Sequence, residues 1–220
     1  MIEITCDKLF ASIPPYLVKI FNNAKYPWDI LKNINSYIKE IHEECLQNGF
    51  KEYTKGVLIG RNTIIATTAT IIAPAIIGHD SEVRHGAFIR GNVITGVGCV
   101  IGNSSEIKNT VILDHAQIPH FNYVGDSVVG NYAHLGAGAV CSNLKSDKTL
   151  VIIKSEREIE TGLKKLGAVL ADHAEVGCGC VLNPGTVICN NSRIYPLTSV
   201  RGVVPPDSIM KSSDNIVTIK

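Results

Sequence analysis

The 220-residue sequence is poor in aromatic residues, in charge and in long apolar runs, and each shortage excludes a class of protein. Only 6% of the residues are Phe, Trp or Tyr, although 45% belong to the hydrophobic set, so the core must consist mainly of aliphatic residues. The 21 basic residues nearly cancel the 20 acidic ones. This balance argues against a nucleic-acid-binding protein, because such proteins carry a basic surface.

No apolar run reaches the roughly 18 residues of a membrane span, and the N-terminus lacks the basic and apolar regions of a secretory signal. We therefore expect a cytoplasmic protein without a membrane partner. The seven cysteines are scattered and odd in number, which indicates free thiols in a reducing compartment. Cys178 and Cys180 form a close pair, but a second pair that would complete a structural zinc site is missing. We therefore predict no metal centre.

An aliphatic residue recurs at every sixth position over most of the chain. The first part of this series is Ile59, Ile65, Ile71, Ile77, Val83, Ile89, Thr95, Ile101, Ile107 and Leu113. Small residues stand four positions after nearly all of them. After two five-residue steps the series continues at Ile118, Val124, Val129 and Leu135, lapses over 141–169, and returns from Leu170 to Val200.

This periodicity predicts an all-β solenoid. Six residues rotate an α-helix through about 600°, so a helix cannot place every sixth residue on one face. An ordinary β-sandwich tolerates the period but does not require one large and one small inward position in each unit. The pattern resembles the left-handed parallel β-helix of hexapeptide-repeat proteins, in which three hexapeptides make one coil.

The chain divides into three parts on this interpretation. Residues 1–56 form a helical N-terminal cap or linker, because apolar residues recur there at helical spacing, as at Ile30, Ile34, Ile38 and Ile41. We expect this segment to cap the end of the solenoid. Residues 57–205 form the β-helix, with a loop excursion at about 141–169, and residues 206–220 form a short polar tail.

Polar and titratable residues interrupt the repeat between residues 117 and 145, where broken coils expose unusual side chains. The candidates in this interval are His120, Tyr123, His134 and Asn143. Arg90 and Lys108 each directly follow an aliphatic residue of the preceding repeats. An imidazole near a phenol, an amide and two cations could deprotonate a nucleophile and hold an anionic substrate. An isolated exposed histidine would have no such role, so the interpretation depends on the cluster.

The segment 107–143 resembles the acetyltransferase domain of the bacterial bifunctional UDP-N-acetylglucosamine pyrophosphorylase/glucosamine-1-phosphate N-acetyltransferase. A closer resemblance is to the C-terminal half of archaeal-type sugar-1-phosphate nucleotidylyltransferases that carry an acetyltransferase activity. The His-x-x-Tyr-x-Gly-Asp element that begins at His120 is the most specific match. The matching segments are 105–109, 119–127, 135–138, 143–144, 162–168, 183–185 and, before the repeat, 26–31.

This resemblance implies acetyl-CoA-dependent N-acetylation of an amino-sugar 1-phosphate, either glucosamine- or galactosamine-1-phosphate. In the family, the histidine at the position of His120 is the general base that takes a proton from the sugar amine. The basic residues at the positions of Arg90 and Lys108 bind the sugar phosphate.

The resemblance also assigns roles to the remaining polar residues. Tyr123 and Asn143 match residues that contact the sugar, and Asn143 also lies near the acetyl group, which places it with His120 in the catalytic set. Glu106 is expected to orient Lys108 or the sugar. His134 stands where the bacterial enzymes carry Asn, and this departure would alter the choice of sugar or add a titrating group.

The family binds acetyl-CoA in a groove between neighbouring β-helices of a homotrimer. By this resemblance, the candidate acetyl-CoA-binding residues are Ala137, Ala139, Asp172 and Asn190. The excursion at about 141–169 is either a solvated loop or short hairpin, or an arm that packs on the adjacent subunit and closes the site. In the second interpretation, Lys164 and Lys165 would contact phosphate groups of acetyl-CoA or sugar.

Residues 1–56 contain no Gly-rich loop of the nucleotidylyltransferase fold. We therefore expect this chain to act as a stand-alone acetyltransferase, and a separate nucleotidylyltransferase could be its partner. The alternative is a non-catalytic trimeric binding or assembly module related to UDP-N-acetylglucosamine pyrophosphorylase. Binding of acetyl-CoA would distinguish the two hypotheses.

Overall fold

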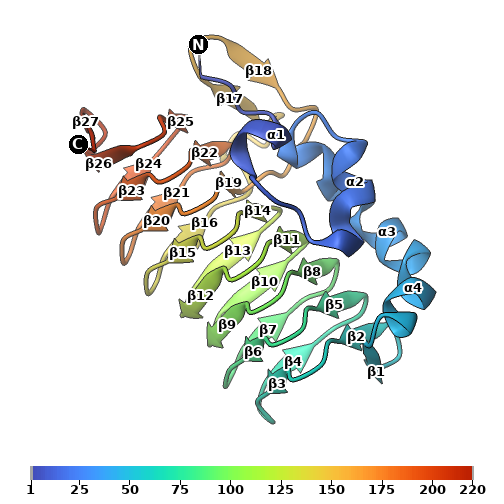
Figure 1. The fold of residues 1–220 in the computed structure, drawn as a ribbon. Helices are drawn as coiled ribbons and strands as arrows, with labels where there is room; N and C mark the ends of the chain where they lie inside the picture. The colour runs from blue at the N-terminus through green and yellow to red at the C-terminus, as the bar shows by residue number, and fades with distance from the viewer. Residues whose placement is uncertain (1, 220) are drawn as a thin grey trace.

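Short strands stack into three parallel sheets in a computed structural model that describes residues 2–219 (Figure 1). We call the three sheets faces A, B and C. Face A consists of β1 (Lys51–Thr54), β2 (Val57–Ile59), β5 (Ala75–Ile77), β8 (Val93–Thr95), β11 (Thr110–Ile112), β14 (Val128–Val129), β19 (Ala168–Leu170), β22 (Thr186–Ile188) and β25 (Val203–Val204).

Faces B and C complete each coil. Face B consists of β3 (Ile64–Ile65), β6 (Glu82–Val83), β9 (Val100–Asn103), β12 (Gln117–His120), β15 (His134–Leu135), β20 (Glu175–Val176), β23 (Arg193–Ile194), β26 (Ser208–Ser212) and β27 (Asn215–Thr218). Face C consists of β4 (Thr70–Ile71), β7 (Phe88–Ile89), β10 (Glu106–Lys108), β13 (Tyr123–Gly125), β16 (Val140–Cys141), β21 (Val181–Leu182) and β24 (Ser199–Val200).

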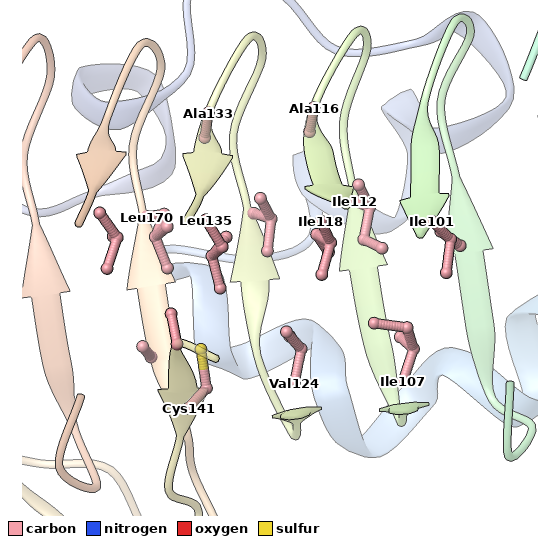
Figure 2. Packing of buried hydrophobic residues seen from close by; sticks show 14 of the residues in the cluster. Ile101, Ile107, Ile112, Ala116, Ile118, Val124, Ala133, Leu135, Cys141 and Leu170 are labelled. Atoms are coloured by element: carbon pink, nitrogen blue, oxygen red, sulfur yellow. The ribbon is translucent and has the colours of Figure 1, made fainter. Parts of the chain in front are cut away.

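The inward residues of successive coils stack on one another along the axis. On face B, Ile101 lies in register with Val83, eighteen residues earlier, and with Ile118, seventeen residues later. Figure 2 shows the same stacking for Ile107, Val124 and Cys141 on face C. These side chains are fully or almost fully buried. The left-handed parallel β-helix of hexapeptide repeats that the sequence predicts is therefore confirmed.

One member of the predicted aliphatic series points outward. Ile112, not Leu113, fills the axis at the end of β11, and Leu113 packs with the residues outside face A. The five-residue step of the repeat therefore falls between Ile107 and Ile112. The following inward position, Ile118, is again six residues on. The coil from Ile101 to Ile118 is therefore one residue shorter than the coil before it.

The helical N-terminal segment lies along the outside of face A (Figure 1). It contains α1 (Cys6–Leu9), α2 (Val18–Asn22), α3 (Ile34–Glu40), α4 (His42–Gln47) and 3₁₀ helices at Pro15–Leu17 and Pro27–Asn33. Its apolar side chains, including the buried Trp28, pack on one outward residue from each of seven coils, namely Leu58, Ile76, Ile94, Val111, Val128, Val169 and Val187. The expectation that this segment caps the end of the solenoid is wrong for most of its length. Its last part, α4 and β1, lies at β2 in the first coil.

Polar side chains at the corner between faces A and B hold the N-terminal segment in place. The Asp172 carboxylate accepts hydrogen bonds from the backbone N–H of Ala11 at 2.8 Å and from both the backbone and the side chain of Asn131. The Asn190 side-chain amide donates to the carbonyl of Leu9 at 2.9 Å. The acetyl-CoA-binding role of Asp172 and Asn190 stays a prediction, and both side chains hydrogen-bond to the N-terminal segment in this structure.

The excursion leaves the solenoid after β16 and returns at β19. Its middle forms an antiparallel hairpin of β17 (Ile152–Lys154) and β18 (Glu158–Glu160). Val151, Ile153 and Leu166 are fully buried in the apolar cluster outside face A. The excursion therefore contains a short hairpin, as the first of the two interpretations allowed, and its buried apolar residues pack on its own chain. At the C-terminus, β26 and β27 form a second antiparallel hairpin. Within residues 2–219, no helix has the length and apolar character needed to cross a membrane.

The seven cysteines are unpaired, and only Cys178 is classed as exposed. Burial raises the pKa of the Cys99 and Cys141 thiols to about 12. Because the thiolate is the reactive form, we expect a thiol reagent at neutral pH to modify Cys178 quickly and the buried cysteines only after unfolding. Mass spectrometry of the native protein checks this. A second cysteine could also react quickly in the wild type but not in Cys178→Ser. That result would mean that modification of Cys178 opens the fold and exposes the second thiol.

Candidate active site

Four consecutive strands of face C bring the predicted polar residues together. Glu106 on β10 lies in register with Phe88 on β7 and with Tyr123 on β13, which in turn lies in register with Val140 on β16. Ile107 points to the axis, so its neighbours Glu106 and Lys108 point outward, as the alternation of a strand requires. Arg90 and Asn143 follow the ends of β7 and β16 and lie at the same corner of the coil.

Arg90 and Glu106 form an ion pair between neighbouring coils. The Nη1 atom of Arg90 lies 2.6 Å from Oε1 of Glu106. The hydrogen bond to this carboxylate raises the pKa of the exposed Arg90 guanidinium, which thus stays charged. An exposed pair of this kind contributes little to stability. Its effect is to keep a cation and an anion side by side on face C.

Lys108 is paired with a residue that was given no role from the sequence. Its Nζ atom lies 3.5 Å from Oδ2 of Asp126. The Asp126 carboxylate is buried, with 6% of the residue exposed, and also accepts hydrogen bonds from the amides of Asn109 at 2.8 Å and Asn143 at 2.5 Å. Asp126 is the last residue of the His-x-x-Tyr-x-Gly-Asp element, so the sequence contained the signal.

Tyr123 and Asn143 are joined by a further hydrogen bond. The side-chain N–H of Asn143 donates to the phenol oxygen of Tyr123 at 3.1 Å. Partial burial raises the pKa of Tyr123, and the negative charges of Asp126 and Glu106 raise it further. The phenol is therefore protonated at neutral pH and can act as a hydrogen-bond donor on this surface.

His120 lies at the end of β12, at the corner where the chain turns from face B into face C. The Asn122 side chain holds this turn, because its oxygen accepts from the backbone N–H of His120 at 3.0 Å and its amide donates to the carbonyl of Gly136 at 2.8 Å. The His120 residue is exposed, and its imidazole has no hydrogen bond or ion pair within residues 2–219. It is therefore free to meet a ligand.

Besides Asp172 and Asn190, three more of the predicted site residues lie outside the face C cluster. His134 lies on β15 of face B, where its Nδ1 atom is 3.1 Å from the Glu175 carboxylate. The Ala139 side chain is fully buried in the axis of the β-helix, so only its backbone could contact a ligand. Ala137 lies half-buried at the corner that follows His134, one coil beyond His120.

The model of the GMPPB C-terminal domain family matches residues 71–192, which is more than half of the chain. The chain belongs to this family. The match includes the strands that carry Arg90, Glu106, Lys108, His120 and Tyr123, so the cluster on face C lies within the family domain. The resemblance that the sequence indicated is confirmed at this level.

Curated relatives of this GMPPB C-terminal domain protein agree with that placement. The bifunctional protein GlmU of Methanococcus maripaludis is 30% identical over 203 residues, which cover 91% of this chain and 49% of that protein. A bifunctional sugar-1-phosphate nucleotidylyltransferase/acetyltransferase of Sulfurisphaera tokodaii is 39% identical over 97 residues, which cover 44% of this chain and 24% of that protein. The putative acetyltransferase YaiX of Escherichia coli is 35% identical over 178 residues, which cover 80% of this chain and 77% of that protein.

Two of these relatives carry the word acetyltransferase in their names. The chain spans about half the length of the GlmU proteins that it matches. YaiX is matched over most of its length, and its name also describes an acetyltransferase.

Proposed function

We propose that this chain transfers an acetyl group from acetyl-CoA to the amine of an amino-sugar 1-phosphate, with glucosamine- or galactosamine-1-phosphate as the substrate. The observation that carries this proposal is the arrangement of Arg90, Glu106, Lys108, Tyr123 and Asn143 on consecutive coils of face C, with the free imidazole of His120 at the corner where the chain enters this face. The acetyltransferase names of the curated relatives support the choice of reaction.

His120 acts as the general base in the proposed mechanism. Its neutral imidazole takes a proton from the sugar amine as the amine nitrogen attacks the thioester carbonyl carbon. A carbon–nitrogen bond forms, the carbon–sulfur bond breaks, and the thiolate of CoA leaves and is protonated. A base that makes no hydrogen bond in the free protein can turn toward the amine without first losing a partner.

The two cations provide the phosphate site in this proposal. Arg90 supplies a planar donor group and Lys108 a point charge, and both are suited to phosphate oxygens. Each already faces a carboxylate, Glu106 or Asp126. A phosphate therefore joins a network whose charges nearly cancel. Such a site selects a small dianion, whereas a broad basic surface would bind any polyanion.

The site on face C is open to solvent, because Arg90 and His120 are exposed. We propose that a neighbouring copy of the chain in a homotrimer covers this face, and that acetyl-CoA lies in the groove between the two copies near Ala137. The backbone around Ala139 would contribute to the groove in place of its buried side chain. His134 would reach the substrate only from the neighbouring copy, because it lies on face B of its own chain.

The test is turnover of acetyl-CoA with amino-sugar 1-phosphates, followed by mass spectrometry of the N-acetylated product. Product detection is preferred to a thiol reagent because the exposed Cys178 also reacts with such reagents. The control is Cys178→Ser, which should turn over normally. Failure to bind acetyl-CoA by calorimetry, with trimers still formed, would contradict the proposal and support the alternative of a non-catalytic assembly module.

We expect the phosphate group to decide which sugars are accepted. Removing it from the substrate, or making Arg90→Ala or Lys108→Ala, should each raise KM by about tenfold or more, because a hydrogen bond to a charged group is lost. Steady-state kinetics with glucosamine and glucosamine-1-phosphate measure this effect. In Arg90→Ala, the preference for the phosphorylated sugar should shrink. An unchanged preference in both variants would show that the phosphate binds elsewhere.

A further inference from the structure

Asp126 lies at the centre of the polar cluster on face C, although its buried carboxylate is not placed to meet a substrate. One carboxylate oxygen accepts from the Asn109 amide, and the other faces both the Asn143 amide and the Lys108 ammonium group. The backbone of Asp126 has a φ of 49°, which turns the chain sharply after β13 and directs the side chain across the neighbouring coils. Asp126 thus contacts two of the proposed substrate-binding residues at once.

The carboxylate determines which way the Asn143 amide points. An ionised carboxylate can only accept hydrogen bonds, so the NH₂ group of Asn143 must face Asp126. The same NH₂ group donates its second hydrogen to the phenol oxygen of Tyr123. Both donor hydrogens of Asn143 are therefore used within the cluster.

This arrangement fixes the pattern of donors and acceptors that a substrate meets. The amide oxygen of Asn143 has no partner within residues 2–219 and remains available as an acceptor. The phenol of Tyr123 uses its oxygen to accept from Asn143 and retains its hydrogen as a donor. With Lys108 beside them, face C offers an acceptor, a donor and a cation. If Asn143 were rotated by 180°, its acceptor would be lost to the substrate.

We infer that Asp126 is a positioning residue that fixes the Asn143 amide and the Lys108 ammonium group in the orientation that recognises an amino-sugar 1-phosphate. The inference rests on the proposed function for its substrate. The free acceptor of Asn143 suits an N–H or O–H group of the sugar, and Lys108 suits its phosphate. Asp126 acts through these two residues and does not itself touch the substrate.

A purely structural role for Asp126 is the competing explanation, and the chain contains matched controls for it. Asn62 donates to the Asp80 carboxylate at 2.9 Å, and Asn191 donates to the Asp207 carboxylate at 2.8 Å. Both pairs join neighbouring coils as Asn109 and Asp126 do, and Asp80 and Asp207 also have positive φ values. Neither carboxylate contacts a lysine or an amide of the proposed site.

The first experiment compares the isosteric variants Asp126→Asn and Asp80→Asn. We expect Asp126→Asn to lower kcat/KM for the amino-sugar 1-phosphate by about 100-fold, because a displaced binding group costs about that much. Asp80→Asn should stay within about twofold of the wild type. In an Asn143→Ala background, Asp126→Asn should cost less than about tenfold, because its partner is already absent. An active wild type with equal kcat/KM in the Asp126→Asn and Asp80→Asn variants would overturn the inference and leave the proposed function standing.

The second experiment does not depend on activity. Alkaline titration of Tyr123, followed by NMR of ¹³Cζ-labelled tyrosine and assigned with Tyr123→Phe, reports on the contact with Asp126. Removing a negative charge favours the phenolate, so Asp126→Asn should lower the pKa of Tyr123, and Asp80→Asn should leave it unchanged. If the wild type shows no turnover, the proposed function fails and this titration alone decides the arrangement. An unchanged Tyr123 titration in Asp126→Asn would overturn the inference.

Discussion

We expect His120→Ala to lower kcat for the proposed N-acetylation by about 10²- to 10⁴-fold, the usual contribution of a positioned general base. KM for the sugar phosphate should change only a few-fold, because Arg90 and Lys108 still hold the phosphate. The reason for the selective loss of kcat is geometric. The His120 imidazole makes no hydrogen bond within residues 2–219, so its removal leaves no buried partner unsatisfied and should not unfold the corner. The measurement is steady-state turnover with product detection by mass spectrometry.

The matched control is His173→Ala. His173 is also an exposed histidine at a turn, and its own φ is positive. It lies at the corner between faces A and B, where it stacks on Tyr132 with ring centroids 5.1 Å apart. This variant should keep wild-type kcat. Equal turnover in the His120→Ala variant and the wild type would show that the amine loses its proton to another group, and the proposed mechanism would then be wrong.

The sequence predicts the axis of the fold well because the β-helix repeats one physical requirement many times. Each face of each coil needs one aliphatic residue pointing inward, so the series from Ile59 to Val200 identifies the solenoid without knowledge of its surroundings. The same regularity explains the cluster on face C. Arg90 and Lys108 follow equivalent inward residues, Ile89 and Ile107, so they come to the same corner on neighbouring coils.

The covering of face A was missed, although the sequence contains a signal for it. Successive residues of a strand point alternately inward and outward. If the outward residues face solvent, apolar and polar residues should alternate, as Glu106, Ile107 and Lys108 do on β10. Several strands of face A instead read as apolar triplets, such as Val57–Ile59 and Ala75–Ile77. An outward apolar residue in the middle of each triplet requires a partner. The N-terminal helices supply it along the side of the solenoid.

The contacts of Asp172 with the N-terminal segment could not be predicted from the sequence for a different physical reason. A resemblance to a family predicts the type of site that a chain contains. It does not predict which corner of the β-helix the N-terminal segment of the same chain covers. Asp114, Asn131 and Asp172 follow one another at the corner between faces A and B, and their side chains hydrogen-bond to the preceding coil or to the N-terminal segment. No periodicity distinguishes these polar corners from polar corners that bind a ligand.

Asp172→Ala should therefore destabilise the corner that holds the N-terminal segment by about 3 kcal/mol, because Ala11 of that segment and the backbone and side chain of Asn131 in the solenoid lose a buried charged acceptor. Trp28, the one tryptophan of the sequence, is almost fully buried between this segment and face A. Its fluorescence should shift to longer wavelength at a lower denaturant concentration in the variant than in the wild type. The far-UV circular dichroism signal of the β-helix should be lost at a higher denaturant concentration, since the axis of stacked aliphatic residues does not include Asp172.

Asp207→Ala is the control for this prediction, because it removes a single exposed contact with Asn191 and should cost much less. The comparison also decides between the two roles considered for Asp172. If the carboxylate holds the N-terminal segment, KM for acetyl-CoA in the folded Asp172→Ala variant stays within about twofold of the wild type while the Trp28 transition moves. A raised KM for acetyl-CoA with an unmoved Trp28 transition would restore Asp172 to the binding site. In that case the hydrogen bond to Ala11 would have to break when acetyl-CoA binds, and the N-terminal segment would be a movable cover over face A.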